Sequence, residues 1–215
     1  MTDLKFSLPH NVDHLIYVVA DLEAGRDHIE QLLGVRPVIG GRHPQYGTHN
    51  AQVSLGPATY LELIAPDPEA EIPEAEVLFG IDTFREPRFL TWVLRSESIE
   101  QTAALAAATG VGLGAVSPGK RIKPDGTVVS WKLTNPLALP LDGAVPFLIS
   151  WGDTPHPAGS SPRAGELSGL RFEHPEAERV RKALQVLGAD SEVVHGERFR
   201  MVARIKTERG EIEIQ

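Results

Sequence analysis

Two runs of alternating side chains predict a β-hairpin in which one carboxylate is out of place. The runs cover 48–55 and 59–67, and a Gly-Pro turn joins them. Because successive side chains of a strand point to opposite faces, Tyr60, Glu62 and Ile64 share one face. Both faces are mostly apolar, so we expect the strand to be covered on both sides. A carboxylate in that position needs an ion pair, a hydrogen bond or a metal as its partner.

The residues before this hairpin predict a strand, a helix and a second strand. β-branched and aromatic residues favour a strand over 13–20. Asp21 is a suitable N-cap for a helix over 22–33, where apolar residues recur at helical spacing and a glycine follows the last turn. We expect a short strand over 35–39 and a loop over 40–47, which is rich in glycine and polar residues. The unit therefore has the order strand, helix, strand, strand, strand.

The same order of elements returns twice along the chain. The second copy is expected to have a helix over 98–109 and strands at 89–95, 112–116, 127–133 and 147–151. The third copy is expected to have a helix over 174–187 and strands at 167–172, 191–194, 199–206 and 211–214. The interval between copies is roughly 75 residues, which is typical of an internal repeat.

These copies predict an α+β fold built from tandem βαβββ modules. Modules 10–67 and 87–152 are expected to form one domain over 10–152, and 165–215 a third, C-terminal module. Proline-rich segments separate the modules and are interpreted as connectors.

Composition narrows the class of protein. The chain has 215 residues, of which 41% are hydrophobic and 23% charged, as in ordinary soluble proteins. Its net charge of -8 argues against a nucleic-acid surface, and no apolar stretch is long enough to cross a membrane. The absence of cysteine excludes disulfides, thiolate ligands and a cysteine nucleophile. With no secretory signal in residues 1–11, we expect a cytoplasmic protein.

The module order, with a histidine in the first strand and a glutamate in the fourth, resembles the vicinal oxygen chelate superfamily. This superfamily includes glyoxalase I, extradiol ring-cleaving dioxygenases, and fosfomycin and bleomycin resistance proteins. The matching stretches are Asp13-His14-Leu15, 41–44, 47–50 and 60–67, and the first module is most similar to glyoxalase-like domains. The resemblance implies that two modules curl their sheets into an open barrel, whose interior holds a divalent metal and a small substrate.

The resemblance places His14 and Glu62 at the metal positions of the first module. With His49 they would form a facial triad that leaves metal positions open for substrate oxygens. The metal would be Zn, Mn, Fe, Ni or Co, and Glu62 would also be the catalytic proton carrier. His49 comes from a strand that seldom supplies a ligand, so orienting Glu62 or touching substrate are alternatives for it. The structural alternatives are a hydrogen-bonded core His14 and an ion pair between Glu62 and Arg42.

The second module departs from the glyoxalase I pattern. Its strands at 89–95 and 147–151 contain no carboxylate or imidazole. A four-ligand site within one chain is therefore not expected. His174, His195 or a residue of a second subunit are the remaining candidates to complete a three-ligand site.

Five residues are candidates for substrate binding. Asn50 and Tyr60 offer polar groups near the proposed site, and Arg42 is expected in a loop where it would gate the cavity or hold an anionic group. Trp92 and Trp151 would form an aromatic wall, with ordinary core packing as the alternative.

The resemblance and the candidate residues favour a metal-dependent lyase, isomerase or dioxygenase-type enzyme acting on a small oxygen-bearing molecule. The alternative is a non-catalytic protein of the sequestering resistance type, which would bind a small molecule in the same cavity without metal. A third module that covers a sheet edge or makes a homodimer contact is a further alternative. Neither nucleic acid nor membrane is expected as a partner.

Overall fold

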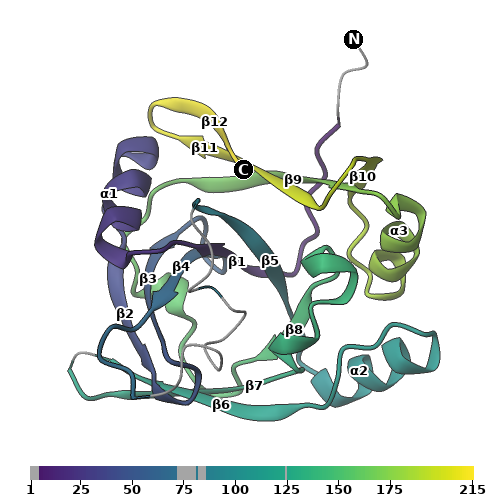
Figure 1. Ribbon diagram of the computed structural model, residues 1–215, viewed down its shortest axis with the longest axis horizontal. Helices are drawn as coiled ribbons and strands as arrows, with labels where there is room; N and C mark the ends of the chain where they lie inside the picture. The colour runs from purple at the N-terminus through teal and green to yellow at the C-terminus, as the bar shows by residue number, and fades with distance from the viewer. Residues whose placement is uncertain (1–4, 72–80, 82–85, 124) are drawn as a thin grey trace.

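The molecule consists of an eight-stranded barrel with a four-stranded sheet packed beside it (Figure 1). The computed structural model describes residues 5–71, 81, 86–123 and 125–215. In the barrel the strands follow the order β1-β4-β3-β2-β6-β7-β8-β5, and in the sheet β10-β9-β11-β12. Within the described part of the chain, no helix has the length and apolar character needed to span a membrane.

The first module has the predicted order of elements. Its elements are β1 (Val12–Val18), α1 (Leu22–Leu33), β2 (Val38–His43), the short 3-10 helix η1 (Pro44–Tyr46), β3 (Thr48–Ser54) and β4 (Tyr60–Pro66). The predicted helix ends are confirmed: the Asp21 side chain accepts a hydrogen bond from the Ala24 backbone N–H at 2.8 Å, and Gly34 adopts a left-handed φ of 78°.

The predicted loop over 40–47 is wrong in its first half, because β2 continues to His43. The glycines there serve close approach of the backbone instead of a turn. Gly41 has a φ of 147°, and a Cβ atom on it would lie 2.3 Å from the carbonyl oxygen of Ile122. This contact is one of the two places where the modules meet, since Arg42 pairs with Ile122 across β2 and β6.

The second module supplies the other half of the barrel. Its elements are β5 (Arg88–Arg95), α2 (Ile99–Ala108), β6 (Ser117–Ile122), β7 (Val128–Leu133) and β8 (Phe147–Ser150). The strand predicted over 112–116 is wrong, because β6 begins at Ser117. β6 contains a proline and a glycine, which have low strand propensity, so its sequence does not predict a strand. Gly119 is nevertheless required there, because a Cβ atom would lie 2.2 Å from Trp131 Nε1.

Both modules join into a single closed barrel, where an open one was expected. β1 pairs in parallel with β4 and antiparallel with β5, while β5 pairs in parallel with β8. The β2–β6 contact completes the ring. The barrel interior is therefore enclosed on all sides by strands.

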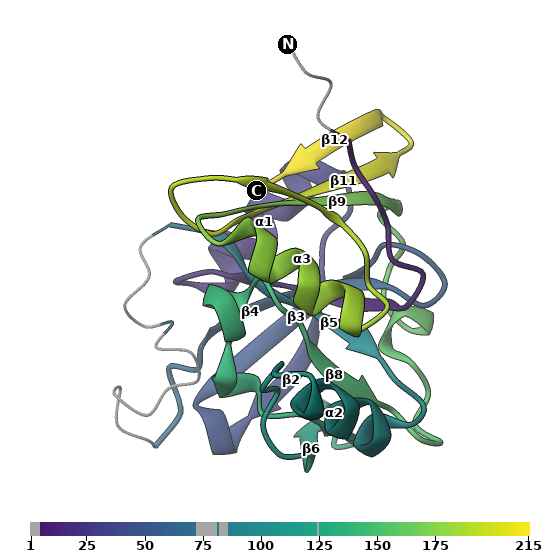
Figure 2. The same cartoon turned by 90° about the vertical axis from the view of Figure 1, so that its right-hand side faces the viewer.

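The third module forms the separate sheet. Its elements are β9 (Glu166–His174), α3 (Ala177–Val186), β10 (Glu192–His195), β11 (Arg200–Thr207) and β12 (Gly210–Ile214). Figure 2 shows β9, β11 and β12 above the barrel strands. Phe172 of β9 packs on Trp92 of β5 with ring centroids 5.1 Å apart, so the sheet covers one outer side of the barrel.

Two apolar clusters explain why the barrel strands are hydrophobic on both faces. Leu15, Tyr17 and Leu61 belong to the cluster between the barrel and its outer cover. Ile16 and Ile64 belong to a second cluster inside the barrel. Polar side chains on the inner face are exceptions that require a partner.

Candidate functional site

The barrel encloses a cavity with about 550 Å³ of space between protein atoms, its opening included. Its polar lining consists of His14, His43, Asn50, Gln52, Glu62 and Arg121. Its aromatic lining consists of Tyr46, Tyr60, Trp131, Phe147 and Trp151. The cavity therefore combines an apolar, aromatic wall with a small set of polar groups.

Glu62 lies on the cavity wall, as the alternation of β4 predicts. Tyr60, Glu62 and Ile64 all line the cavity, and Glu62 is 7% exposed. The side-chain N–H of Asn50 donates a hydrogen bond to Glu62 Oε1. Glu62 Oε2 lies 3.4 Å from His14 Nε2. The carboxylate thus has one amide donor and one imidazole nitrogen beside it.

Asp13 holds the imidazole of His14 in place. Its carboxylate is fully buried and accepts hydrogen bonds from His14 Nδ1 at 2.8 Å, Trp151 Nε1 at 3.1 Å and His156 Nε2 at 3.1 Å. Burial opposes ionisation, but the hydrogen bonds from His14 and His156 outweigh it and hold the pKa of Asp13 well below its ordinary value. Since Nδ1 faces the Asp13 carboxylate, Nε2 is the ring nitrogen directed at Glu62.

Tyr60 lies flat against the same imidazole. The two rings are stacked, with centroids 4.5 Å apart and planes 18° apart. Burial, together with the charge of Glu62, raises the pKa of the Tyr60 phenol well above its ordinary value. Tyr60 therefore keeps its proton at neutral pH.

A second buried histidine, expected with Arg42 in a loop that would gate the cavity or hold an anionic group, lies instead at the end of a strand. His43 ends β2 and lines the cavity, and its Nδ1 lies 3.1 Å from Thr48 Oγ1. Burial lowers the pKa of His43 to about 4, against the opposing effect of Glu62. His43 is therefore neutral at pH 7. The signal that pointed to it was its place in the stretch 41–44.

Arg121 was missed, because β6 was predicted in the wrong place. Its side chain is 3% exposed and lines the cavity. Nη1 donates to Asn50 Oδ1 at 3.2 Å and Nη2 donates to Gln52 Oε1 at 3.1 Å. Gly40 leaves room for this contact, since a Cβ atom there would lie 2.3 Å from Asn50 Oδ1 and 2.5 Å from Arg121 Nη1. A continuous polar chain therefore runs from Glu62 through Asn50 to Arg121.

Residues 12–188 match the glyoxalase-like domain family Glyoxalase_3. The chain belongs to this family. The match includes both barrel modules and reaches past α3 in the third module. Membership of the glyoxalase-like family confirms the resemblance to the vicinal oxygen chelate superfamily.

One of two similar solved structures shows the same fold for this glyoxalase-like protein. A hypothetical protein from Staphylococcus aureus is similar with a TM-score of 0.65 and 15% identity, covering 95% of this chain and 98% of that one. Methylmalonyl-CoA epimerase from Mycobacterium tuberculosis is similar with a TM-score of 0.44 and 20% identity, covering 73% and 97% of the two chains. No curated protein matches the sequence.

Three of the residues predicted for the site lie elsewhere in the glyoxalase-like fold. His49 alternates with Asn50 and Gln52 along β3, so it lies on the outer face, half-buried and away from the cavity. Arg42 forms surface ion pairs with Asp67 at 2.9 Å and Glu69 at 2.8 Å.

Trp92, the third, faces the outer cover of the barrel. Its Nε1 donates to the Ala144 carbonyl oxygen at 3.0 Å, and its ring packs on Phe172. Trp92 therefore serves core packing, which was the alternative interpretation.

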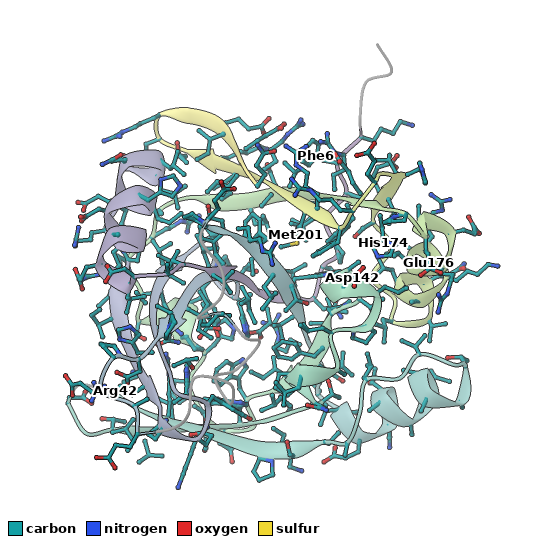
Figure 3. The ribbon with its side chains drawn as sticks, viewed as in Figure 1. Phe6, Arg42, Asp142, His174, Glu176 and Met201 are labelled. Atoms are coloured by element: carbon teal, nitrogen blue, oxygen red, sulfur yellow. The ribbon has the colours of Figure 1, made fainter. Side chains whose placement is uncertain are left out.

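The other predicted residues do line the cavity, and neither histidine proposed to complete the site does: His195 is exposed at the end of β10, and His174 also lies in the third module. His14, Asn50, Tyr60, Glu62 and Trp151 come together there. Figure 3 places His174 near Asp142 and Glu176, beside α3, and Arg42 at the far periphery. His174 Nε2 lies 3.4 Å from Asp142 Oδ2. It belongs to the third module and not to the barrel interior.

The donor set does not fit the three-ligand metal centre that the superfamily implies. His14 and Glu62 are adjacent, but His49 is on the opposite face of its strand. Asn50 Oδ1 already accepts a hydrogen bond from Arg121, whose positive charge faces the same cavity. Among the described residues, no group of three or more His, Asp or Glu side chains is arranged to hold a metal ion.

Proposed function

We propose that this glyoxalase-like protein is an enzyme that binds a small oxygen-bearing organic molecule in its barrel cavity and moves a proton on it. Glu62 is the proton carrier. The observation that supports this most is the buried Glu62 carboxylate, which faces the cavity between the Asn50 amide and His14 Nε2. Buried carboxylates in apolar cavities are common general acids and bases.

The chemistry follows from the pair formed by His14 and Glu62. His14 directs Nδ1 at Asp13, and its Nε2 lies 3.4 Å from Glu62 Oε2, so these two atoms can share a proton. In the proposed step Glu62 takes a proton from a carbon next to a carbonyl group, and the electron pair of the broken C–H bond moves toward the carbonyl oxygen. Tyr60 donates a hydrogen bond to that oxygen and keeps its proton. Glu62 then returns the proton to the carbon as the electron pair moves back, so neither residue changes its charge over the cycle.

A non-catalytic binder is the second candidate, and the aromatic lining favours it. Trp131 and Trp151 face the cavity with ring centroids 5.6 Å apart, and Phe147 and Tyr60 extend the wall. Flat apolar ligands stack well on such surfaces. In this case Glu62 and Asn50 only orient the ligand.

A divalent-metal-dependent reaction is the third candidate. The observation in its favour is the Asp13–His14 hydrogen bond, since metal-binding histidines commonly donate their other ring N–H to a carboxylate. Only His14 and Glu62 would bind the metal, so substrate oxygens and water would fill the other positions.

Proton exchange in heavy water distinguishes an enzyme from a binder. Small 2-oxo and 2-hydroxy compounds are incubated with the protein in D₂O, and loss of the signal from the hydrogen on the neighbouring carbon is followed by NMR. Catalysed exchange of at least one compound supports the enzyme. Saturable quenching of tryptophan fluorescence without exchange of any bound compound supports the binder instead.

A further inference from the structure

Arg121 is a buried cation without a carboxylate partner among the described residues. Its guanidinium donates to two neutral amide oxygens, of Asn50 and Gln52, and Nε has no hydrogen-bond partner. A buried charge is costly unless an opposite charge or a full set of hydrogen bonds compensates it. Here the compensation is incomplete.

Glu62, the carboxylate that lines the same cavity, is separated from Arg121 by a carboxamide side chain. Asn50 accepts from Arg121 with Oδ1 and donates to Glu62 with Nδ2, so its side chain separates the cation from the carboxylate. The guanidinium and Glu62 thus face one cavity without forming an ion pair with each other. A small molecule in the cavity that contacts both groups would bring its anionic group to Arg121 and its reacting carbon to Glu62.

A second groove is lined by the same arginine. Arg121, Lys123, His156, Thr127, Thr154 and Ser160 supply its polar lining, and no described Asp or Glu lines it. A neighbouring hollow shares Arg121 and Lys123 and includes Asp125. In a chain with a net charge of -8, a groove lined by cations and hydroxyl groups favours the approach of an anion.

We propose that the cavity takes a small organic carboxylate and that Arg121 binds its two oxygens. The planar guanidinium can donate two parallel hydrogen bonds to a carboxylate, and it matches a phosphate in the same way, so inorganic phosphate is a competitor in the test. This inference rests on the proposed function, because it assumes that the cavity is the substrate site. It adds the substrate class: an acid whose carbon near the carboxylate carries the exchangeable proton.

Matched pairs of acids and amides test this assignment. Binding of 2-oxobutyrate, 2-oxobutanamide and inorganic phosphate is measured by tryptophan fluorescence and ligand-observed NMR, with the full chain. We expect the acid to bind at least about tenfold more tightly than the amide, because a charge-assisted hydrogen bond contributes about 1.5–3 kcal/mol. Arg121→Met should remove the preference. Lys120→Met is the matched control, since Lys120 is an exposed cation on the same strand.

The outcomes separate this inference from the proposed function. Equal binding of acid and amide by the wild type overturns the carboxylate site while leaving the cavity as a binding site. Tighter binding of phosphate than of acid overturns the planar ligand. Absence of binding by any compound of either class overturns both proposals. If Arg121→Met does not fold, Arg121→Lys keeps the charge without the two-point geometry, and an unchanged preference in that variant contradicts the assignment.

Discussion

The His14 imidazole donates its Nδ1 proton to Asp13 over 2.8 Å, and this single contact fixes which ring nitrogen faces the cavity. The opposite nitrogen, Nε2, then lies 3.4 Å from Glu62. Under the proposed function, proton transfer therefore depends on a carboxylate that does not itself line the cavity. Asp13 is a positioning residue in this account, and Glu62 is the catalytic one.

Replacement of Asp13 tests that positioning role. Asp13→Asn removes the negative charge that stabilises three donors, so we expect a loss of about 1–3 kcal/mol in the free energy of unfolding. We also expect the His14 tautomer to change, because an amide nitrogen can donate to Nδ1. NMR of the ring nitrogens reports the tautomer, and urea unfolding reports stability. An unchanged Nδ1–H signal in a folded Asp13→Asn variant contradicts the assignment.

The acid limb of the stability curve should report the ionisation of Asp13. Its pKa in the folded protein lies below the ordinary value of 3.8, so the unfolded chain binds more protons as the pH falls. The stabilisation by ionised Asp13 is fully present above pH 3.8 and is lost as the pH falls below that value. Urea unfolding between pH 2 and pH 5 should therefore show a steeper loss in the wild type than in Asp13→Asn. Parallel curves count against an ionised Asp13.

His43 should also make the protein less stable as the pH falls, but in a higher pH range than Asp13. Burial lowers its pKa from 6.5 to about 4, so between these values the unfolded chain takes up a proton that the folded protein excludes. The stabilisation that depends on neutral His43 is fully present above pH 6.5. The free energy of unfolding declines by about 3 kcal/mol as the pH falls to about 4. His43→Gln should flatten this segment of the curve. Direct NMR titration giving an ordinary pKa for His43 refutes the explanation.

Gly40 should be intolerant of a methyl group. Gly40→Ala places a Cβ atom against Asn50 and Arg121, so we expect a destabilisation of about 1–3 kcal/mol and weaker ligand binding. Gly112→Ala is the control, because no atom lies within 4 Å of its Cβ position. Thermal unfolding of both variants gives the comparison. If the Gly40→Ala and Gly112→Ala variants are equally stable, the side chains of Asn50 and Arg121 have more room beside Gly40 than the structure indicates.

Metal removal distinguishes the acid–base mechanism from the metal-dependent candidate. Because the described residues supply two adjacent donors and not three, we expect proton exchange to survive dialysis against EDTA. Elemental analysis of protein purified without an affinity metal gives the resting content. Loss of exchange on EDTA treatment, with recovery on addition of Zn, Mn, Fe, Ni or Co, supports the metal instead. Loss of bound metal in His14→Ala and Glu62→Ala then locates it.

The sequence was sufficient where local signals and side-chain alternation agree. The Asp21 and Gly34 caps define α1, and alternation along β4 places Glu62 inside the barrel. Alternation along β3 also places His49 and Asn50 on opposite faces of the strand. The prediction of a metal triad with His49 did not take this into account. The histidine was chosen by residue type and not by the face of its strand.

The remaining errors come from glycines whose role is set by distant contacts. Gly40 makes room for Arg121, Gly41 for the backbone of Ile122, and Gly119 for Trp131. Read locally, these glycines indicate loops, so β2 was ended early and β6 was misplaced. Of the two polar residues that these strands carry into the cavity, His43 was therefore assigned to a loop and Arg121 was not recognised.

Glu62 as the proton carrier is tested most directly by its isosteric amide. On the compound with the fastest exchange, Glu62→Gln should lower the exchange rate by about 10²–10⁴-fold while ligand binding and thermal stability are largely kept. Asp67→Asn, which alters a carboxylate just beyond β4 that pairs with Arg42 outside the cavity, should exchange at the wild-type rate. Wild-type exchange by a folded Glu62→Gln variant contradicts the account.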